Sequence, residues 1–173
     1  MNVILEGIDK IGKTTWAQRL VAKFGFAYFK PPKSNEPYSN FYERYRYLYL
    51  AALDLDHTVH DRSLISEYAY NETREIEMLD DLRLNRADPP LIIIYAASAK
   101  FLEDELRDFR NEVPGVFWET DEKARQYAQI VNESYKKAYI YLDQADYQRL
   151  KFITVDNREH AWKETLSAVE AYQ

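Results

Sequence analysis

The sequence predicts an α/β fold in which a five-stranded parallel sheet carries helices on both faces. Three observations predict it. Short apolar segments alternate with amphipathic segments five times along the 173 residues, as strands and crossover helices do in parallel sheets. Residues 91–95 form an unbroken apolar run, which is typical of a strand buried on both faces. The first apolar segment leads directly into a glycine-containing turn and then into a helical pattern.

The first half of the chain contains three predicted strands and three predicted helices. Residues 2–6 form an apolar strand, and residues 13–24 form a helix because apolar side chains recur on one face. Residues 26–30 form the second strand, which ends where two prolines remove backbone donors. The remaining elements are an aromatic-rich helix at 41–53, a strand at 57–60 and a helical stretch at 64–84 that breaks near Asn71.

The second half repeats this alternation. Asp88-Pro89-Pro90 breaks the chain before the strand at 91–95. A helix at 99–110 leads into the loop 111–120, which contains Pro and Gly. The last elements are a long helix at 121–143, a strand at 151–155 and a helix at 159–171.

The composition fits one globular domain spanning residues 1–173. Hydrophobic residues make up 46% of the chain, which is typical of a folded protein. The net charge of −6 argues against a general nucleic-acid-binding surface, and the lack of cysteine excludes disulfides and thiolate metal sites. No apolar run approaches about 18 residues, and the chain starts with a strand. We therefore expect a cytoplasmic protein without membrane contact, in the host cytoplasm if its source is viral.

Residues 7–15 have the spacing of a phosphate-binding loop, in which a glycine and four further residues precede Gly-Lys-Thr. The glycines let backbone amides turn toward phosphate oxygens, and the dipole of the following helix favours an anion. Lys13 can reach the β- and γ-phosphates of ATP, and the Thr14 hydroxyl can bind Mg²⁺. The alternative is a strand-to-helix turn without a ligand. The predicted ATP site comprises Gly7, Ile8, Asp9, Lys10, Ile11, Gly12, Lys13, Thr14 and Thr15.

A second motif, Asp61-Arg62, follows the third predicted strand. Charged side chains at the end of a buried strand are costly unless they meet an opposite charge. Beside a phosphate loop, that charge is Mg²⁺ for Asp61 and a phosphate for Arg62. The alternative is an Asp–Arg pair that caps the next helix.

These motifs resemble those of the thymidylate kinase family, which is part of the wider group of deoxynucleoside and deoxynucleotide kinases. The resemblance implies the P-loop nucleotide kinase fold. Residues 5–15 look like the family's phosphate loop, including its Asp after the first glycine. The second stretch matches the family's Asp-Arg, Ser and Ala-Tyr at Asp61-Arg62, Ser66 and Ala69-Tyr70. The family has a periodic helix after its lid, and this chain resembles it at Tyr127, Val131 and Tyr135.

The resemblance implies roles for the matching residues. Asp9 would approach the sugar 3′-hydroxyl of the acceptor, Asp61 would position Mg²⁺, and Arg62 would hold the acceptor phosphate. Some members keep a catalytic arginine where this chain has Lys10, which retains the charge but not the planar fork. The alternative for Lys10 is a solvated loop lysine.

Other positions depart from the family pattern. The family's Arg-Glu-Pro after the second strand is Lys30-Pro31-Pro32 here, so Lys30 could replace the arginine while the glutamate is missing. The family's Gln after Ala-Tyr is Asn71. Tyr42 and Arg46 fit the spacing of its base-stacking Phe and following Arg, and Tyr70 is a further aromatic that could stack on the base. The predicted acceptor site therefore comprises Asp9, Lys30, Tyr42, Arg46, Arg62, Ser66, Tyr70 and Asn71.

A lid is expected at about residues 107–120, where Arg107 and Arg110 could close over the transferring phosphate and exclude water. An exposed basic helix face is the alternative. Arg110 joins Lys13, Lys10, Arg62 and Asp9 as predicted catalytic residues.

The function expected from these residues is transfer of the ATP γ-phosphoryl group to a deoxynucleoside monophosphate, with dTMP as the first choice. A deoxynucleoside kinase acting on a 5′-hydroxyl is the alternative, because Asp61-Arg62-Ser63 is similar to a nucleoside kinase motif. A non-catalytic nucleotide-binding regulator is the third. The expected partners are small nucleotides, and the base and the oligomeric state, a homodimer included, stay open.

Overall fold

A five-stranded sheet forms the centre of the molecule, and all its paired strands are parallel, in the order β2-β3-β1-β4-β5. This computed structural model describes residues 1–31, 46, 48–70, 75–82, 88–111 and 121–173. The predicted parallel sheet is confirmed. Its strands are β1 Val3–Gly7, β2 Ala27–Phe29, β3 Thr58–Asp61, β4 Leu91–Ala97 and β5 Leu150–Val155.

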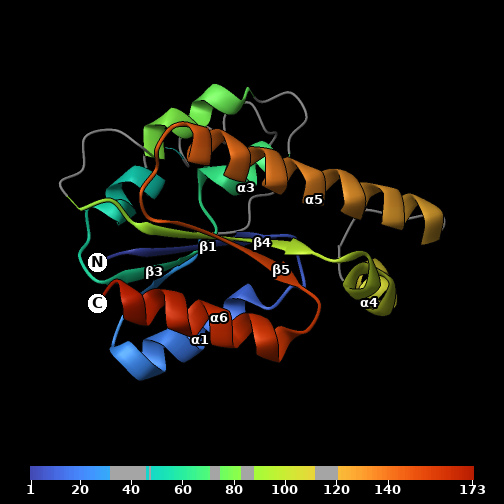
Figure 1. Ribbon diagram of the computed structural model, residues 1–173, viewed down its shortest axis with the longest axis horizontal. Coiled ribbons are helices and arrows are strands. Elements are labelled where there is room, and N and C mark those ends of the chain that lie inside the picture. The colour runs from blue at the N-terminus through green and yellow to red at the C-terminus, as the bar shows by residue number, and fades with distance from the viewer. Residues whose placement is uncertain (32–45, 47, 71–74, 83–87, 112–120) are drawn as a thin grey trace.

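Helices cover both faces of this sheet (Figure 1). Helices α3 and α5 lie on one face, α1 and α6 lie on the other, and α4 lies beyond the carboxyl end of β4. Their bounds are α1 Lys13–Phe24, α3 Leu64–Tyr70, α4 Ala99–Asn111, α5 Asp121–Gln144 and α6 Arg158–Ala171, with a 3₁₀ helix η1 at Ile76–Leu82. Residues 46 and 48–53 are also helical, within the helix expected at 41–53.

The strand order follows from burial. Every residue of β1 and β4 is buried, so these strands occupy the middle of the sheet and are covered by helices on both faces. Strand β2 is largely exposed and lies at an edge. Because β2, β3 and β1 are neighbours, the polar residues at their carboxyl ends meet at one edge of the sheet.

Most predicted boundaries hold within one or two residues. Strand β4 continues through Ala96 and Ala97, which pair with β5. The stretch 64–84 was predicted as helical with a break near Asn71. Its described residues form the short α-helix α3 and the 3₁₀ helix η1. In the described ranges, no helix combines the length and the apolar character needed to cross a membrane.

Candidate active site

The loop between β1 and α1 is bent sharply at its two glycines. Gly12 has φ +124, and a Cβ there would lie 2.7 Å from the Trp16 ring. A Cβ at Gly7 would lie 2.8 Å from the carbonyl oxygen of Tyr95 on β4. Ile8 and Ile11 point into the core and are almost fully buried, so they anchor the loop from below. The sequence spacing therefore produces a fixed backbone turn at the N-terminus of α1, where an anion is favoured.

Lys13 lies inside this turn. Its Nζ donates to the carbonyl oxygens of Gly7 at 2.6 Å and Ile8 at 2.8 Å. Lys13 is buried in this state, because only 5% of the residue is accessible. Burial, with the nearby charge of Arg62, lowers the pKa of Lys13 to about 8. A phosphate in the loop would offer the ammonium a stronger partner than two carbonyls.

Thr14 and Asp61 meet across the gap between α1 and β3. Oγ1 of Thr14 donates to Oδ2 of Asp61 over 2.5 Å, and Asp61 is 1% exposed. Burial alone would raise the pKa of Asp61, but the Thr14 hydrogen bond and the charges of Lys13 and Lys30 outweigh it and lower the pKa. The structure thus brings together the two residues predicted to hold Mg²⁺, with the carboxylate ionised.

Tyr28 on β2 and Lys30, the residue after this strand, also reach the Asp61 side chain. Nζ of Lys30 lies 3.0 Å from Oδ2 of Asp61 and donates to Oγ1 of Thr14 at 3.1 Å. The Tyr28 hydroxyl donates to the same Asp61 oxygen at 3.1 Å. Lys30 therefore lies at the site, as predicted, but in this state it contacts the two candidate metal ligands.

Arg62, Asp9 and Tyr70 form a cluster on the other side of the loop. The Arg62 guanidinium is paired with the Asp9 carboxylate, and its Cζ lies 5.0 Å from the centre of the Tyr70 ring. The Tyr70 hydroxyl accepts a hydrogen bond from the Asp9 amide at 2.9 Å. Burial alone would raise the pKa of Asp9, but the charge of Arg62 outweighs it and lowers the pKa. In this state Tyr70 supports the phosphate loop.

Glu6 is a site residue that the sequence interpretation missed. It is fully buried beneath the loop and accepts hydrogen bonds from the Ser63 amide and, at 2.6 Å, from Oγ of Ser66. Ser66 also lies 3.0 Å from the hydroxyl of Tyr135 on α5. Burial raises the pKa of Glu6 to about 7, although these hydrogen bonds oppose the shift. A carboxylate in an otherwise apolar strand was the available signal.

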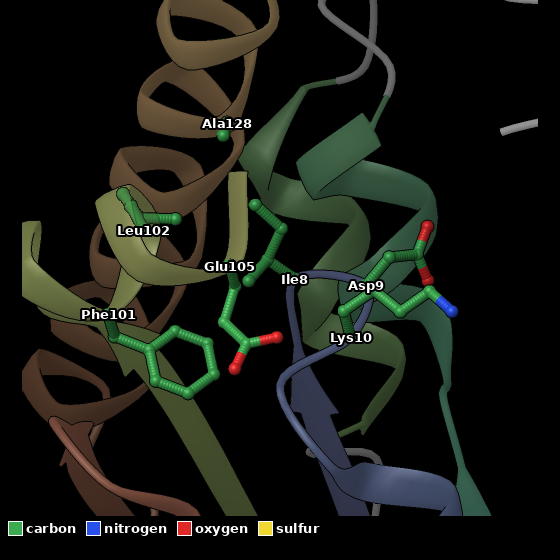
Figure 2. Close-up of a pocket in the computed structure, with 7 residues that line it drawn as sticks. All are labelled: Ile8, Asp9, Lys10, Phe101, Leu102, Glu105 and Ala128. Atoms are coloured by element: carbon green, nitrogen blue, oxygen red, sulfur yellow. The ribbon is translucent and has the colours of Figure 1, made fainter. Parts of the chain in front are cut away.

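The far side of the loop contacts α4 and α6. The Arg158 guanidinium donates to the Lys10 carbonyl oxygen at 2.8 Å and to both carboxylate oxygens of Glu105 on α4. Figure 2 shows a small pocket beside this bridge, with Asp9 and Lys10 on one side and Phe101 and Glu105 on another. The pocket is lined by Ile8, Asp9, Lys10, Phe101, Leu102, Glu105 and Ala128.

Comparison with known proteins connects this geometry to one fold. No family model matches the chain, and no curated protein matches it in sequence. A thymidylate kinase from Candida albicans is 16% identical with a TM-score of 0.64, covering 99% of this chain and 91% of the other. A deoxyadenosine kinase from M. mycoides with bound dATP is 17% identical with a TM-score of 0.57, covering 98% and 100%. The YorR protein from Bacillus subtilis, in complex with phosphorylated GDP, is 16% identical with a TM-score of 0.62, covering 98% and 96%.

The chain has the P-loop nucleotide kinase fold. At these identities the likeness concerns the fold alone.

The remaining predicted site residues lie in different places in the structure. Arg46 is turned toward η1, where its Nε lies 2.6 Å from Oδ2 of Asp81. Thr15 is exposed at the start of α1. Tyr42, Asn71 and most of the predicted lid lie outside the described residues, as do the side chains of Arg107 and Arg110.

Proposed function

We propose that this protein transfers the γ-phosphoryl group of ATP to a deoxynucleoside monophosphate, with dTMP as the preferred acceptor. One observation carries the proposal. The end of β3 presents Asp61 to Thr14 of the loop and Arg62 to Asp9 of the same loop. A carboxylate suited to a metal ion and a cation suited to a phosphate thus lie side by side along one phosphate loop, which supports the proposal.

The residues present fit Mg²⁺. Thr14 and Asp61 would hold the ion, because hydroxyl and carboxylate oxygens are hard ligands and Mg²⁺ in kinases completes its shell with phosphate oxygens and water. When bound, Mg²⁺ would supply positive charge that offsets the negative charge of the phosphates. In the described part of the chain, no three His, Asp or Glu side chains are grouped so that they could hold a metal ion without a nucleotide.

The state of the carboxylates favours a monophosphate acceptor. A nucleoside hydroxyl benefits from a general base, whereas a monophosphate brings an anionic oxygen as its own nucleophile. Asp9 is paired with Arg62, Asp61 is bound to Thr14 and Lys30, and Glu6 is enclosed by two donors. Strand β2 is followed by Lys30 and Pro31, so the chain supplies a cation there.

A deoxynucleoside kinase is the second candidate. The likeness to the M. mycoides deoxyadenosine kinase over almost the whole chain favours it, as does the sequence Asp61-Arg62-Ser63. In this candidate Asp9 would have to leave Arg62 and accept the hydroxyl proton. Since a monophosphate would instead give Arg62 a new anionic partner, the first candidate needs no unpaired cation.

The test is a panel of deoxynucleosides and their monophosphates, supplied with ATP and Mg²⁺, with ADP release as the readout. We expect ADP release only with monophosphates, and most of it with dTMP. Release only with nucleosides would favour the second candidate, and nucleotide binding without acceptor-dependent release would favour a regulator.

The Lys13→Ala variant supplies the control for this panel. It should lower acceptor-dependent ADP release at least about a hundredfold, because it removes a cation from the transferring phosphate. Its circular dichroism spectrum should match that of the wild type. A folded variant with near-normal turnover would show that the loop does not carry the reaction.

A further inference from the structure

Lys30 occupies an unusual position for a residue expected to bind the acceptor. Its ammonium contacts Oδ2 of Asp61 at 3.0 Å and Oγ1 of Thr14 at 3.1 Å. These are the same two oxygens that fit Mg²⁺, and they lie 2.5 Å apart. A single cation therefore bridges the two candidate metal ligands.

The burial of Asp61 explains why a cation is held there. The side chain is 1% exposed, and a buried carboxylate without a partner is strongly disfavoured. Thr14 and Tyr28 donate neutral hydrogen bonds to it, but they supply no charge. Lys30 supplies the positive charge in direct contact with this carboxylate.

Lys30 is also able to leave. Its side chain is 40% exposed and is attached just beyond the edge strand β2, whereas the ammonium of Lys13 is enclosed by the loop. A partly exposed ion pair is weak, so the ammonium can be displaced. A divalent ion that arrives with a nucleotide binds the same oxygens with twice the charge and brings phosphate ligands of its own.

We propose that Lys30 is a tethered substitute for the metal ion, which neutralises the Thr14–Asp61 pair in the metal-free protein and leaves it when a Mg²⁺–nucleotide complex binds. The inference rests on the proposed function and deepens it. The released ammonium lies at the carboxyl end of β2, next to the end of β3 that bears Arg62. Metal binding would thus free a second cation for the acceptor phosphate, so the acceptor site would be completed only after the donor has bound.

The test measures the dissociation constant of ADP by isothermal titration calorimetry, once in excess EDTA and once in saturating Mg²⁺. The dissociation constant in EDTA divided by the dissociation constant in Mg²⁺ is a ratio that reports how strongly the metal supports nucleotide binding. Lys30→Met should raise this ratio about fivefold, which corresponds to the loss of one partly exposed ion pair. In Mg²⁺ the variant has no ammonium to displace, and in EDTA it leaves Asp61 uncompensated beside the phosphates.

Two further variants control for charge and for folding. Lys23→Met removes a similarly exposed lysine on α1, which is paired with Glu170 on α6 at 2.6 Å, and should leave the ratio unchanged. Lys30→Arg keeps the charge and should keep the ratio near the wild-type value. Thermal melting of each variant, followed by circular dichroism, verifies that the compared proteins are folded.

The outcomes separate this inference from the proposed function. An unchanged or lower ratio in Lys30→Met would overturn the inference, even if the wild type phosphorylates dTMP. A raised ratio supports the inference, even if no monophosphate is phosphorylated, because the readout contains no acceptor. A wild type that fails to bind ADP in both buffers would overturn both.

Discussion

Arg62 combines an uncommon backbone with a charge that is mostly enclosed. Its φ is +92, which a residue with a Cβ rarely adopts, and its side chain is 22% exposed. Such a conformation persists only where the surroundings hold it. Here the amide donates to the Leu5 carbonyl oxygen at 3.1 Å, and Asp9 and Tyr70 hold the guanidinium. The backbone turns just after β3, and the Arg62 guanidinium therefore lies along the phosphate loop.

Replacing Arg62 should therefore impair the acceptor more than the donor. In Arg62→Ala we expect the KM for dTMP to rise by an amount that corresponds to about 1.5–3 kcal/mol, while the affinity for ATP changes little. Steady-state kinetics and ATP titration measure the two effects. Arg149→Ala, which removes an arginine paired with Asp88, is the control and should leave both unchanged. Equal losses for donor and acceptor would show that Arg62 only supports the loop.

Glu6 gives the protein a predicted pH dependence of stability. The pKa of Glu6 is about 7 in the folded protein, against 4.5 for an ordinary glutamate, because burial disfavours the charged form. The folded state therefore binds more protons between these two pH values. The free energy of unfolding should fall as the pH rises through this window, by about 3 kcal/mol, and level off above it.

Glu6→Gln should remove this dependence, because an amide does not titrate, its oxygen can still accept from the Ser63 amide, and its NH2 group can donate to the Ser66 hydroxyl. Urea unfolding at about pH 5 and about pH 8 measures the slope in both proteins. Glu122→Gln, an exposed position on α5, should behave like the wild type. Parallel slopes in wild type and Glu6→Gln would show that Glu6 is not responsible.

Spacing in the sequence identifies residue types but not the directions of their side chains. Gly7, Gly12 and Lys13 could be found because a phosphate loop needs them at fixed intervals, and Asp61 because a charged residue ends a buried strand. The inward turn of Lys13 onto two carbonyls depends on the bend of the backbone, so it could not be predicted. The partners of Glu6 lie 57 and 60 residues away along the chain, and no local pattern connects them.

Helix α6 depends on its N-cap for its start. The side chain of Asn157 accepts hydrogen bonds from the amides of Glu159 at 2.8 Å and His160 at 3.1 Å. The next residue, Arg158, connects the helix to the Lys10 carbonyl and to α4. The cap therefore also fixes the residue that joins α6 to the phosphate loop.

Asn157→Ala should lower the free energy of unfolding by about 1 kcal/mol, because two amides of the first turn lose their acceptor. For a chain of this length the melting temperature should fall by about 2–4 °C. Asn157→Ser, which can still cap, should recover most of the loss. A variant as stable as the wild type would mean that water replaces the cap without cost.

Element types follow from periodicity, whereas some boundaries depend on tertiary contacts. The apolar run at 91–95 predicted β4, but the added pairing of Ala96 and Ala97 comes from β5. Likewise, periodicity suggested helix at 64–84 with a break near Asn71, and the structure forms η1 as a 3₁₀ helix whose Leu79 and Leu82 are buried. Short apolar segments satisfy either geometry, so packing decides between them.

The whole molecule brings together residues that are distant in the chain. The order β2-β3-β1 aligns Lys30, Asp61 and the phosphate loop at one edge of the sheet. The alternation of strands and helices predicted a parallel sheet, in which ligands bind at the carboxyl ends of the strands. Strand order itself is set by which strands are buried on both faces, as the fully buried β1 and β4 show.

The central claim is that this edge of the sheet accepts a monophosphate. The measurement that tests it most directly is a competition between dTMP and isotopically labelled thymidine at equal concentration, with ATP and Mg²⁺, followed by chromatographic separation of the products. We predict that dTDP accumulates while the labelled thymidine stays unchanged, because Arg62 and the released Lys30 require an anionic partner. Labelled dTMP formed without any dTDP would contradict the claim and identify a nucleoside kinase.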